Sequence, residues 1–222
     1  MFSGFSQDAV DFLWGIRFHN EKSWFEAHKE IYLSQIIQPM RALGEQVYQS
    51  IQTTHPELGL TLHVSRIYRD ARRLHGRGPY KDHIWFTLRK PKDSIRTQPV
   101  FYFEIAPEYY SYGMGCYDAT PSFMEAFRRR IDQNPKPLEK LARHLSNSEF
   151  QLDGDCYKRP KKAVEGVLKD WYNRKRIALI HDENCEGLLF QPELSQKVIQ
   201  GFEFLVPYYL YLYSVSADEL LL

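Results

Sequence analysis

The stretch HIWFTL, residues 83–88, decides the fold class. Apolar and more polar residues alternate along it, which is the two-residue period of a β-strand with one buried face. The stretch FYFEI at residues 101–105 repeats the pattern, and a third alternating run at 110–114 follows across Pro107. Because the last two runs lie a hairpin's distance apart and no long crossover helix separates them, an antiparallel sheet is expected.

Helical spacing replaces this alternation in the N-terminal part of the chain. Ser6 is expected to cap a first helix, and a longer helical pattern runs from Phe25 to about residue 53 with Pro39 inside it. A proline removes a backbone donor and crowds the preceding turn, so a break or kink is expected at Pro39. Asn20 is expected to cap the second helix, and Phe25 to anchor that helix in the core.

Helical patterns return after the sheet region. Gly113 is expected to loosen the third strand, and Thr120 to cap a helix that begins directly after it. A short helix over residues 138–145, a buried strand within 176–181 and a helix from Pro192 complete the pattern.

These elements predict an α+β fold in a single domain over residues 1–222. Its mainly antiparallel central sheet, at about 62–117, would be flanked by N-terminal helices at about 6–53 and by C-terminal helices and strands at about 120–216.

Composition excludes several classes of protein. The chain has 222 residues, of which 43% are hydrophobic and 26% charged, so it can bury a core and is not expected to be disordered or collagen-like. Its three cysteines form no C-x-x-C pair, and free thiols suit a reducing cytosol. Neither a secretory signal nor an apolar run long enough to span a bilayer is recognised. A cytoplasmic protein without a membrane partner is therefore expected.

Charge is distributed unevenly along the chain, although the formal net charge is only +1. Residues 66–96 hold ten Lys and Arg against three Asp and Glu, and residues 181–222 hold seven Asp and Glu against one Lys. These two segments could lie on separate faces or neutralise one another, and only the first arrangement creates a surface that attracts anions.

Four residues in the basic segment share one side if the chain there is extended: Arg66, Tyr68, Asp70 and Arg72. Two interpretations of the guanidinium groups around Asp70 stay open. In the functional one, Asp70 orients the arginines, whose forked donors bind a phosphate or carboxylate. In the structural one, Asp70 only neutralises an arginine at the end of a strand.

A turn at Gly78 and Pro79 is expected to bring Tyr80 and Lys81 beside the arginine segment. The neighbouring glycines do not form a phosphate-binding loop, because Asp82 stands where that motif requires a hydroxyl residue after its lysine. The predicted ligand site therefore consists of six residues: Arg66, Arg69, Asp70, Arg72, Tyr80 and Lys81.

Two motifs resemble a known family. The first is Asn20-Glu21-Lys22-Ser23-Trp24-Phe25, which is similar to an Asn-x-x-x-Trp-Phe signature of the domain of unknown function 2461 family. The second combines Arg69-Asp70-x-Arg72 with Pro79-Tyr80-Lys81 and resembles the central motif of that family. The resemblance implies a single intracellular domain and no particular reaction. The loop differs from the family pattern, since Gly76 replaces an acidic residue and Leu74 a hydroxyl residue, while Arg77 keeps the positive charge.

The sequence favours binding of, or action on, a small molecule that carries a phosphate or carboxylate. The first alternative is a structural or protein-interaction module in which the same residues form a polar network that stabilises the fold. Nucleic-acid binding is a second alternative, disfavoured by the low net charge. No catalytic residue and no cofactor is assigned. No metal site is predicted, because His181, Asp182, Glu183 and Cys185 lack ligand spacing.

Overall fold

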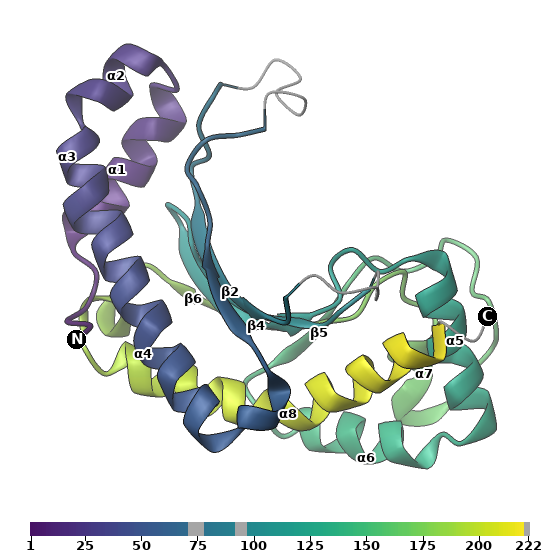
Figure 1. Cartoon of the computed structure of the whole chain (residues 1–222). Helices are drawn as coiled ribbons and strands as arrows, with labels where there is room; N and C mark the ends of the chain where they lie inside the picture. The colour runs from purple at the N-terminus through teal and green to yellow at the C-terminus, as the bar shows by residue number, and fades with distance from the viewer. Residues whose placement is uncertain (71–77, 92–96, 220–222) are drawn as a thin grey trace. The chain divides into compact units, whose positions relative to one another are not determined.

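The computed structural model describes residues 1–70, 78–91 and 97–219. It confirms the α+β class, with a six-stranded antiparallel sheet (Figure 1). The strands lie in the order β1-β2-β3-β4-β6-β5. Their bounds are β1 Thr61–Val64, β2 Ile84–Arg89, β3 Val100–Ile105, β4 Tyr109–Gly115, β5 Gln151–Asp153 and β6 Ala178–Asn184.

The chain divides into two compact units. The first unit contains Met1–Leu88, Tyr102–Tyr112 and Asp182–Gln200. The second unit is formed by the segments Arg89–Phe101, Gly113–His181 and Gly201–Leu222. One domain over residues 1–222 stays a prediction.

The first helix of the first unit begins as the sequence indicates. Ser6 caps the first helix, because its hydroxyl accepts a hydrogen bond from the backbone N–H of Ala9 at 3.3 Å. The N-terminal helices are α1 Gln7–Phe18, α2 Lys22–Ala27, α3 Lys29–Ile31, a π-helical turn at Tyr32–Ile37, and α4 Gln38–Thr54. Short 3₁₀ turns at Pro56–Leu58 and Gly187–Phe190 also belong to this unit.

The expected irregularity at Pro39 is a π-helical turn placed directly before it. Pro39 lies in the first turn of α4, directly after this π-helical turn, and its nitrogen has no hydrogen to donate to the ladder. At Gln38 the backbone N–H reaches back five residues, to the carbonyl of Leu33. The widened turn therefore absorbs the proline without ending the helical path.

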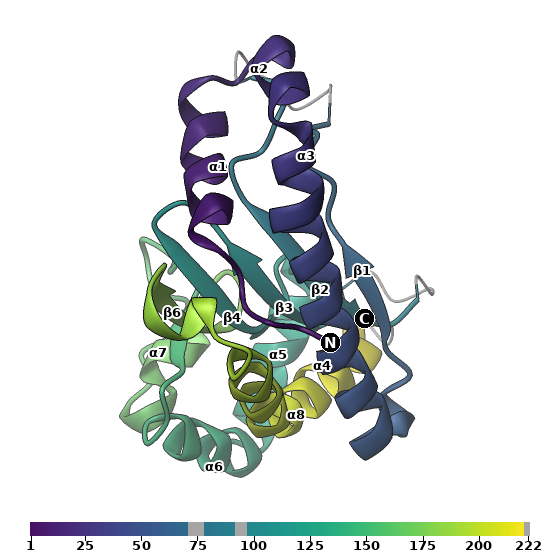
Figure 2. The same cartoon turned by 90° about the vertical axis from the view of Figure 1, so that its left-hand side faces the viewer.

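Helix α4 packs against the sheet through Gly44. A Cβ at Gly44 would lie 3.0 Å from Leu62 of β1 and 3.3 Å from Phe86 of β2, so the absence of a side chain allows a close approach. Figure 2 shows α1 and the α3–α4 run side by side. The core beneath them includes Phe86 stacked on Phe103 at 5.7 Å between ring centroids.

The second unit has its own aromatic core. Phe101 stacks on Phe202 and on Tyr209, with 5.0 Å between ring centroids in each pair. Thr120 caps α5 as expected, accepting from the N–H of Phe123. The helices here are α5 Pro121–Gln133, α6 Lys136–Leu145, α7 Lys169–Tyr172, preceded by a 3₁₀ turn at Gly166–Leu168, and the later part of α8 Leu194–Glu219.

The segment Leu194–Glu219 is helical, as expected, and α8 contains Pro207 without ending there. Among the described residues, no helix combines the length and the apolar character that crossing a membrane requires.

The expectation that Gly113 loosens β4 is wrong, because the strand continues through it to Gly115. A Cβ at Gly113 would lie 2.0 Å from the carbonyl oxygen of Leu179, and one at Gly115 would lie 2.8 Å from the Cα of Ala178. The glycines therefore let the β4 and β6 backbones approach more closely than any side chain permits.

We expect Gly113→Ala to destabilise the protein by about 1–3 kcal/mol or more, because backbone atoms must move to admit the methyl group. Urea unfolding followed by circular dichroism measures the change. The control is Gly59→Asn, which adds a side chain where no atom lies within 4 Å and at a φ of +58° that Asn tolerates. A Gly113→Ala protein as stable as the Gly59→Asn protein would contradict the close-approach argument.

Candidate functional site

The site begins with a short backbone pairing in the first unit. Tyr68 and Tyr80 form an antiparallel bridge. On either side of it the N–H of Arg69 donates to the carbonyl of Pro79 at 2.8 Å, and the N–H of Lys81 donates to the carbonyl of Ile67 at 2.7 Å. The expected return of the chain beside the arginine segment is thus confirmed. Residues 71–77, which connect the two strands, lie outside the described residues.

Asn20 holds this pairing from the α1–α2 connection. Its Nδ2 donates to the carbonyl of Tyr80 at 3.0 Å, and its Oδ1 accepts from the N–H of Tyr80 at 2.9 Å. A Cβ at Gly78 would lie 2.1 Å from that Oδ1, so the glycine makes room for the amide. The predicted capping role is wrong, since the N-cap of α2 is Glu21 and the Asn20 side chain is used at Tyr80 instead.

Tyr80 faces the helices rather than solvent. Its ring stacks on Phe25 with 4.5 Å between centroids, and Tyr68 lies 5.3 Å from it on the same side. Tyr80 is only 3% exposed, and burial raises the pKa of its hydroxyl. This predicted ligand residue therefore packs in the core beside the expected anchor Phe25 and does not line the groove described next.

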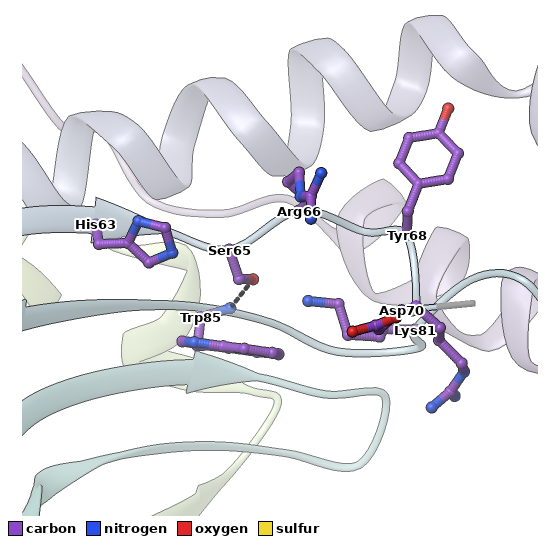
Figure 3. Close-up of a pocket in the computed structure, with 8 residues that line it drawn as sticks. His63, Ser65, Arg66, Tyr68, Asp70, Lys81 and Trp85 are labelled. Carbon is purple, nitrogen blue, oxygen red and sulfur yellow. Dashed lines mark hydrogen bonds between the residues drawn. The ribbon is translucent and has the colours of Figure 1, made fainter. Parts of the chain in front are cut away.

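An open groove of about 410 Å³ lies beside the pairing (Figure 3). Four of the six predicted ligand residues line it: Arg66, Arg69, Asp70 and Lys81. Arg72 lies outside the described residues. The pairing thus brings together residues that are up to 15 positions apart in sequence.

Four further residues line the groove that the sequence did not assign to a site: His63, Ser65, Tyr68 and Trp85. Ser65 and Trp85 are joined by two hydrogen bonds, one from the N–H of Ser65 to the Trp85 carbonyl at 2.8 Å and one from the N–H of Trp85 to the Ser65 hydroxyl at 3.1 Å. The sequence could have indicated Trp85 as a groove residue, because in an extended chain it shares a face with Lys81, four residues earlier. Its ring centroid lies 3.7 Å from the Lys81 Nζ.

Positive charge is concentrated around Lys81. Burial lowers its pKa, the charges of Arg69 and Arg66 lower it further, and Glu104 of β3 acts in the opposite direction, giving a pKa of about 8. The side chain extends along the groove toward Ser65 and Trp85 (Figure 3). Lys81 therefore exchanges its proton near neutral pH, unlike an ordinary lysine.

Arg69 is held in place by neighbouring groups. Its Nε donates to the carbonyl of Tyr80 at 2.7 Å, and its guanidinium lies 3.7 Å from the carboxylate of Asp82. Asp82 also accepts from Arg17 at 2.6 Å and contacts His83 at 3.0 Å. Burial alone would raise the pKa of Asp82, but the hydrogen bonds from Arg17 and His83 lower it below its usual value. The carboxylate thus stays ionised and fixes the arginine beside the groove.

The groove combines two guanidinium groups with a partly buried amine. Forked guanidinium donors are suited to phosphate and carboxylate groups. Within the described part of the chain, no three His, Cys, Asp or Glu side chains come close enough together to hold a metal ion.

Comparison with known proteins agrees with the two motifs. The family model described as conserved hypothetical protein (DUF2461) matches residues 8–211. The chain belongs to this family. No curated protein matches it. The two motifs that resemble DUF2461 meet in space, because Asn20 and Phe25 of the first contact Tyr80 of the second.

We expect Asn20→Ala to destabilise the protein by about 1–3 kcal/mol, because the N–H and carbonyl of Tyr80 each lose a partner in a partly buried position. Chemical denaturation measures the loss. The control is Asn147→Ala, which removes an exposed amide at the end of α6 and should change stability by less than about 0.5 kcal/mol. Equal stability of the two variants would show that the Asn20 contacts contribute nothing.

Proposed function

We propose that the groove binds a small molecule that carries a phosphate or a carboxylate, through Arg66, Arg69 and Lys81. Three cationic side chains line one open groove, and its volume of about 410 Å³ lies within the range of small-molecule sites. The same groove contains Asp70, whose carboxylate can orient the cations or accept a hydrogen bond from the ligand.

The observation that carries this proposal is the convergence of Arg66, Arg69 and Lys81 on one groove. Burial lowers the pKa of Lys81 most, and the positive charges of Arg69 and, to a smaller extent, Arg66 lower it further, which shows that these cations act on one another. The positive charges of Arg66, Arg69 and Lys81 repel one another, and this repulsion raises the free energy of the empty groove. A bound anion removes that repulsion, which favours binding beyond the hydrogen bonds themselves.

The two arginines would contribute differently. Arg69 is already held by Tyr80 and Asp82, so it loses little freedom when a ligand binds. Arg66 is exposed, and its donors can rearrange around the anion. An anion between them would be bound by one fixed and one adaptable group.

We expect Arg66→Gln to weaken binding of inorganic phosphate or malonate at least about tenfold, since hydrogen bonds to charged groups contribute about 1.5–3 kcal/mol. Isothermal titration calorimetry at constant ionic strength measures the affinity. The control, Arg41→Gln, removes an equally exposed arginine from α4 and should leave the affinity unchanged. Equal effects of the two variants, or undiminished binding in Arg66→Gln/Lys81→Gln, would place the site elsewhere.

The structural alternative applies to part of the cluster. Tyr80 and Arg69 make contacts that support the local fold. Arg66 and Asp70 are exposed, and exposed charged groups contribute little to stability. A function in ligand binding is therefore the better account of the exposed pair.

We expect Asp70→Ala to change the free energy of unfolding by less than about 0.5 kcal/mol, the usual range for an exposed residue. Chemical denaturation of this variant beside the wild-type protein checks the value. A loss of about 3–5 kcal/mol, typical of a broken buried ion pair, would support the structural interpretation of the cluster instead.

A further inference from the structure

Lys81 has properties that anion binding alone does not require. Two arginines already supply permanently charged donors to the groove. A third cation contributes most to anion binding when it is fully protonated. Burial and the two arginines instead make the Lys81 amine easier to deprotonate, which weakens it as a cation and makes it a better nucleophile.

The position of the amine suits attack on a ligand in the groove. The backbone of Lys81 is fixed by its hydrogen bond to Ile67, so its side chain starts from a defined point. The side chain extends along the groove, and Nζ lies 3.7 Å from the centroid of the Trp85 ring (Figure 3). That aromatic face can also stabilise a planar protonated imine formed at the same nitrogen.

We propose that Lys81 forms an imine with a carbonyl compound whose carboxylate or phosphate is bound by Arg66 and Arg69. This inference rests on the proposed function, because the anion would hold the carbonyl carbon near Nζ. It adds a covalent step and narrows the ligand to anionic aldehydes and ketones.

The step needs no oxidant or other reactant. The unprotonated Nζ attacks the carbonyl carbon, so a C–N bond forms while the C=O π bond becomes a C–O single bond. Two protons pass from nitrogen to that oxygen, which leaves as water when the C=N bond forms. Asp70, the carboxylate in the groove, is the group that can transfer these protons.

The reactivity can be estimated against ordinary lysines. At pH 8 about half of an amine with a pKa of about 8 is unprotonated, compared with roughly 0.4% for a pKa of 10.4. Lower basicity offsets about half of this advantage on a logarithmic scale, as for other nucleophiles. Lys81 should therefore react about tenfold faster than an exposed lysine at this pH.

The experiment traps the imine in the full-length protein. The protein is incubated with glyoxylate or glycolaldehyde phosphate and sodium cyanoborohydride, and peptide mass spectrometry locates the secondary amine. Acetaldehyde and glycolaldehyde are the matched neutral carbonyls, and the exposed Lys22 and Lys140 are controls in the same sample. Lys81→Arg keeps the charge and should remove the fast adduct, while circular dichroism checks its fold.

We expect labelling at Lys81 to exceed that at Lys22 about tenfold at pH 8. The ratio should fall as the pH rises toward 10.5, because the controls deprotonate there while Lys81 is already neutral. The charged and titratable groups that face or act on the amine are Arg66, Arg69, Asp70, His63 and Glu104. Labelling at Lys81 no faster than at Lys22 would overturn the inference.

A second comparison separates this inference from the proposed function. Arg66→Gln should slow labelling by the anionic carbonyls about tenfold and labelling by the neutral ones only slightly, because Arg66 makes the smallest contribution to the pKa of Lys81, whereas Arg41→Gln should affect neither. Fast labelling at Lys81 without any preference for anionic carbonyls would support Lys81 as a nucleophile and contradict the proposed anion site. If calorimetry shows that phosphate binds but Lys81 is labelled slowly, the proposed anion site is supported and imine formation is contradicted.

Discussion

The antiparallel pairing of Tyr68 with Tyr80 is the constraint on which the site depends. Side chains of an extended chain alternate between two faces, so the two tyrosines project toward Phe25 while Lys81 projects the other way. The hydrogen bonds from Asn20 fix the backbone of Tyr80, and with it the start of β2. The same pairing therefore places Tyr80 in the core under the helices and Lys81 in the groove.

Electrostatic repulsion in the groove is balanced by carboxylates placed around it. Asp82 binds Arg17 and lies beside Arg69, and Glu104 acts favourably on Lys81. These acidic residues belong to the sheet region, so charge balance near the groove does not depend only on the acidic C-terminal segment that the sequence suggested. Because Asp82 lies beside Arg69, its charge orients that guanidinium, which is the role that the functional interpretation of the cluster gives to Asp70.

The sequence predicted the parts that follow from local chemistry. Alternation at residues 84–88 and the cap at Ser6 depend on neighbours in the chain, and the structure confirms both. Strand β1 lies almost wholly within the region expected to form the sheet, but the sequence did not single it out as a strand, although its apolar Leu62 and Val64 alternate with Thr61 and His63. The contact of Asn20 with Tyr80 joins residues 60 positions apart, so no local pattern could indicate it. From the sequence alone, Asn20 looks like an ordinary helix cap, because it is a polar residue directly before a helix.

The structural and functional interpretations of the cluster concern different atoms of the same segment. Tyr80 is buried on one face, and Arg66 is exposed beside the groove. Arg69 belongs to both groups, since its Nε supports the backbone while its guanidinium lies beside the groove. A change at Arg69 would therefore alter folding and binding together and could not separate them. Folding and binding can be separated only at side chains that line the groove without supporting the backbone. Arg66 and the amine of Lys81 are such positions.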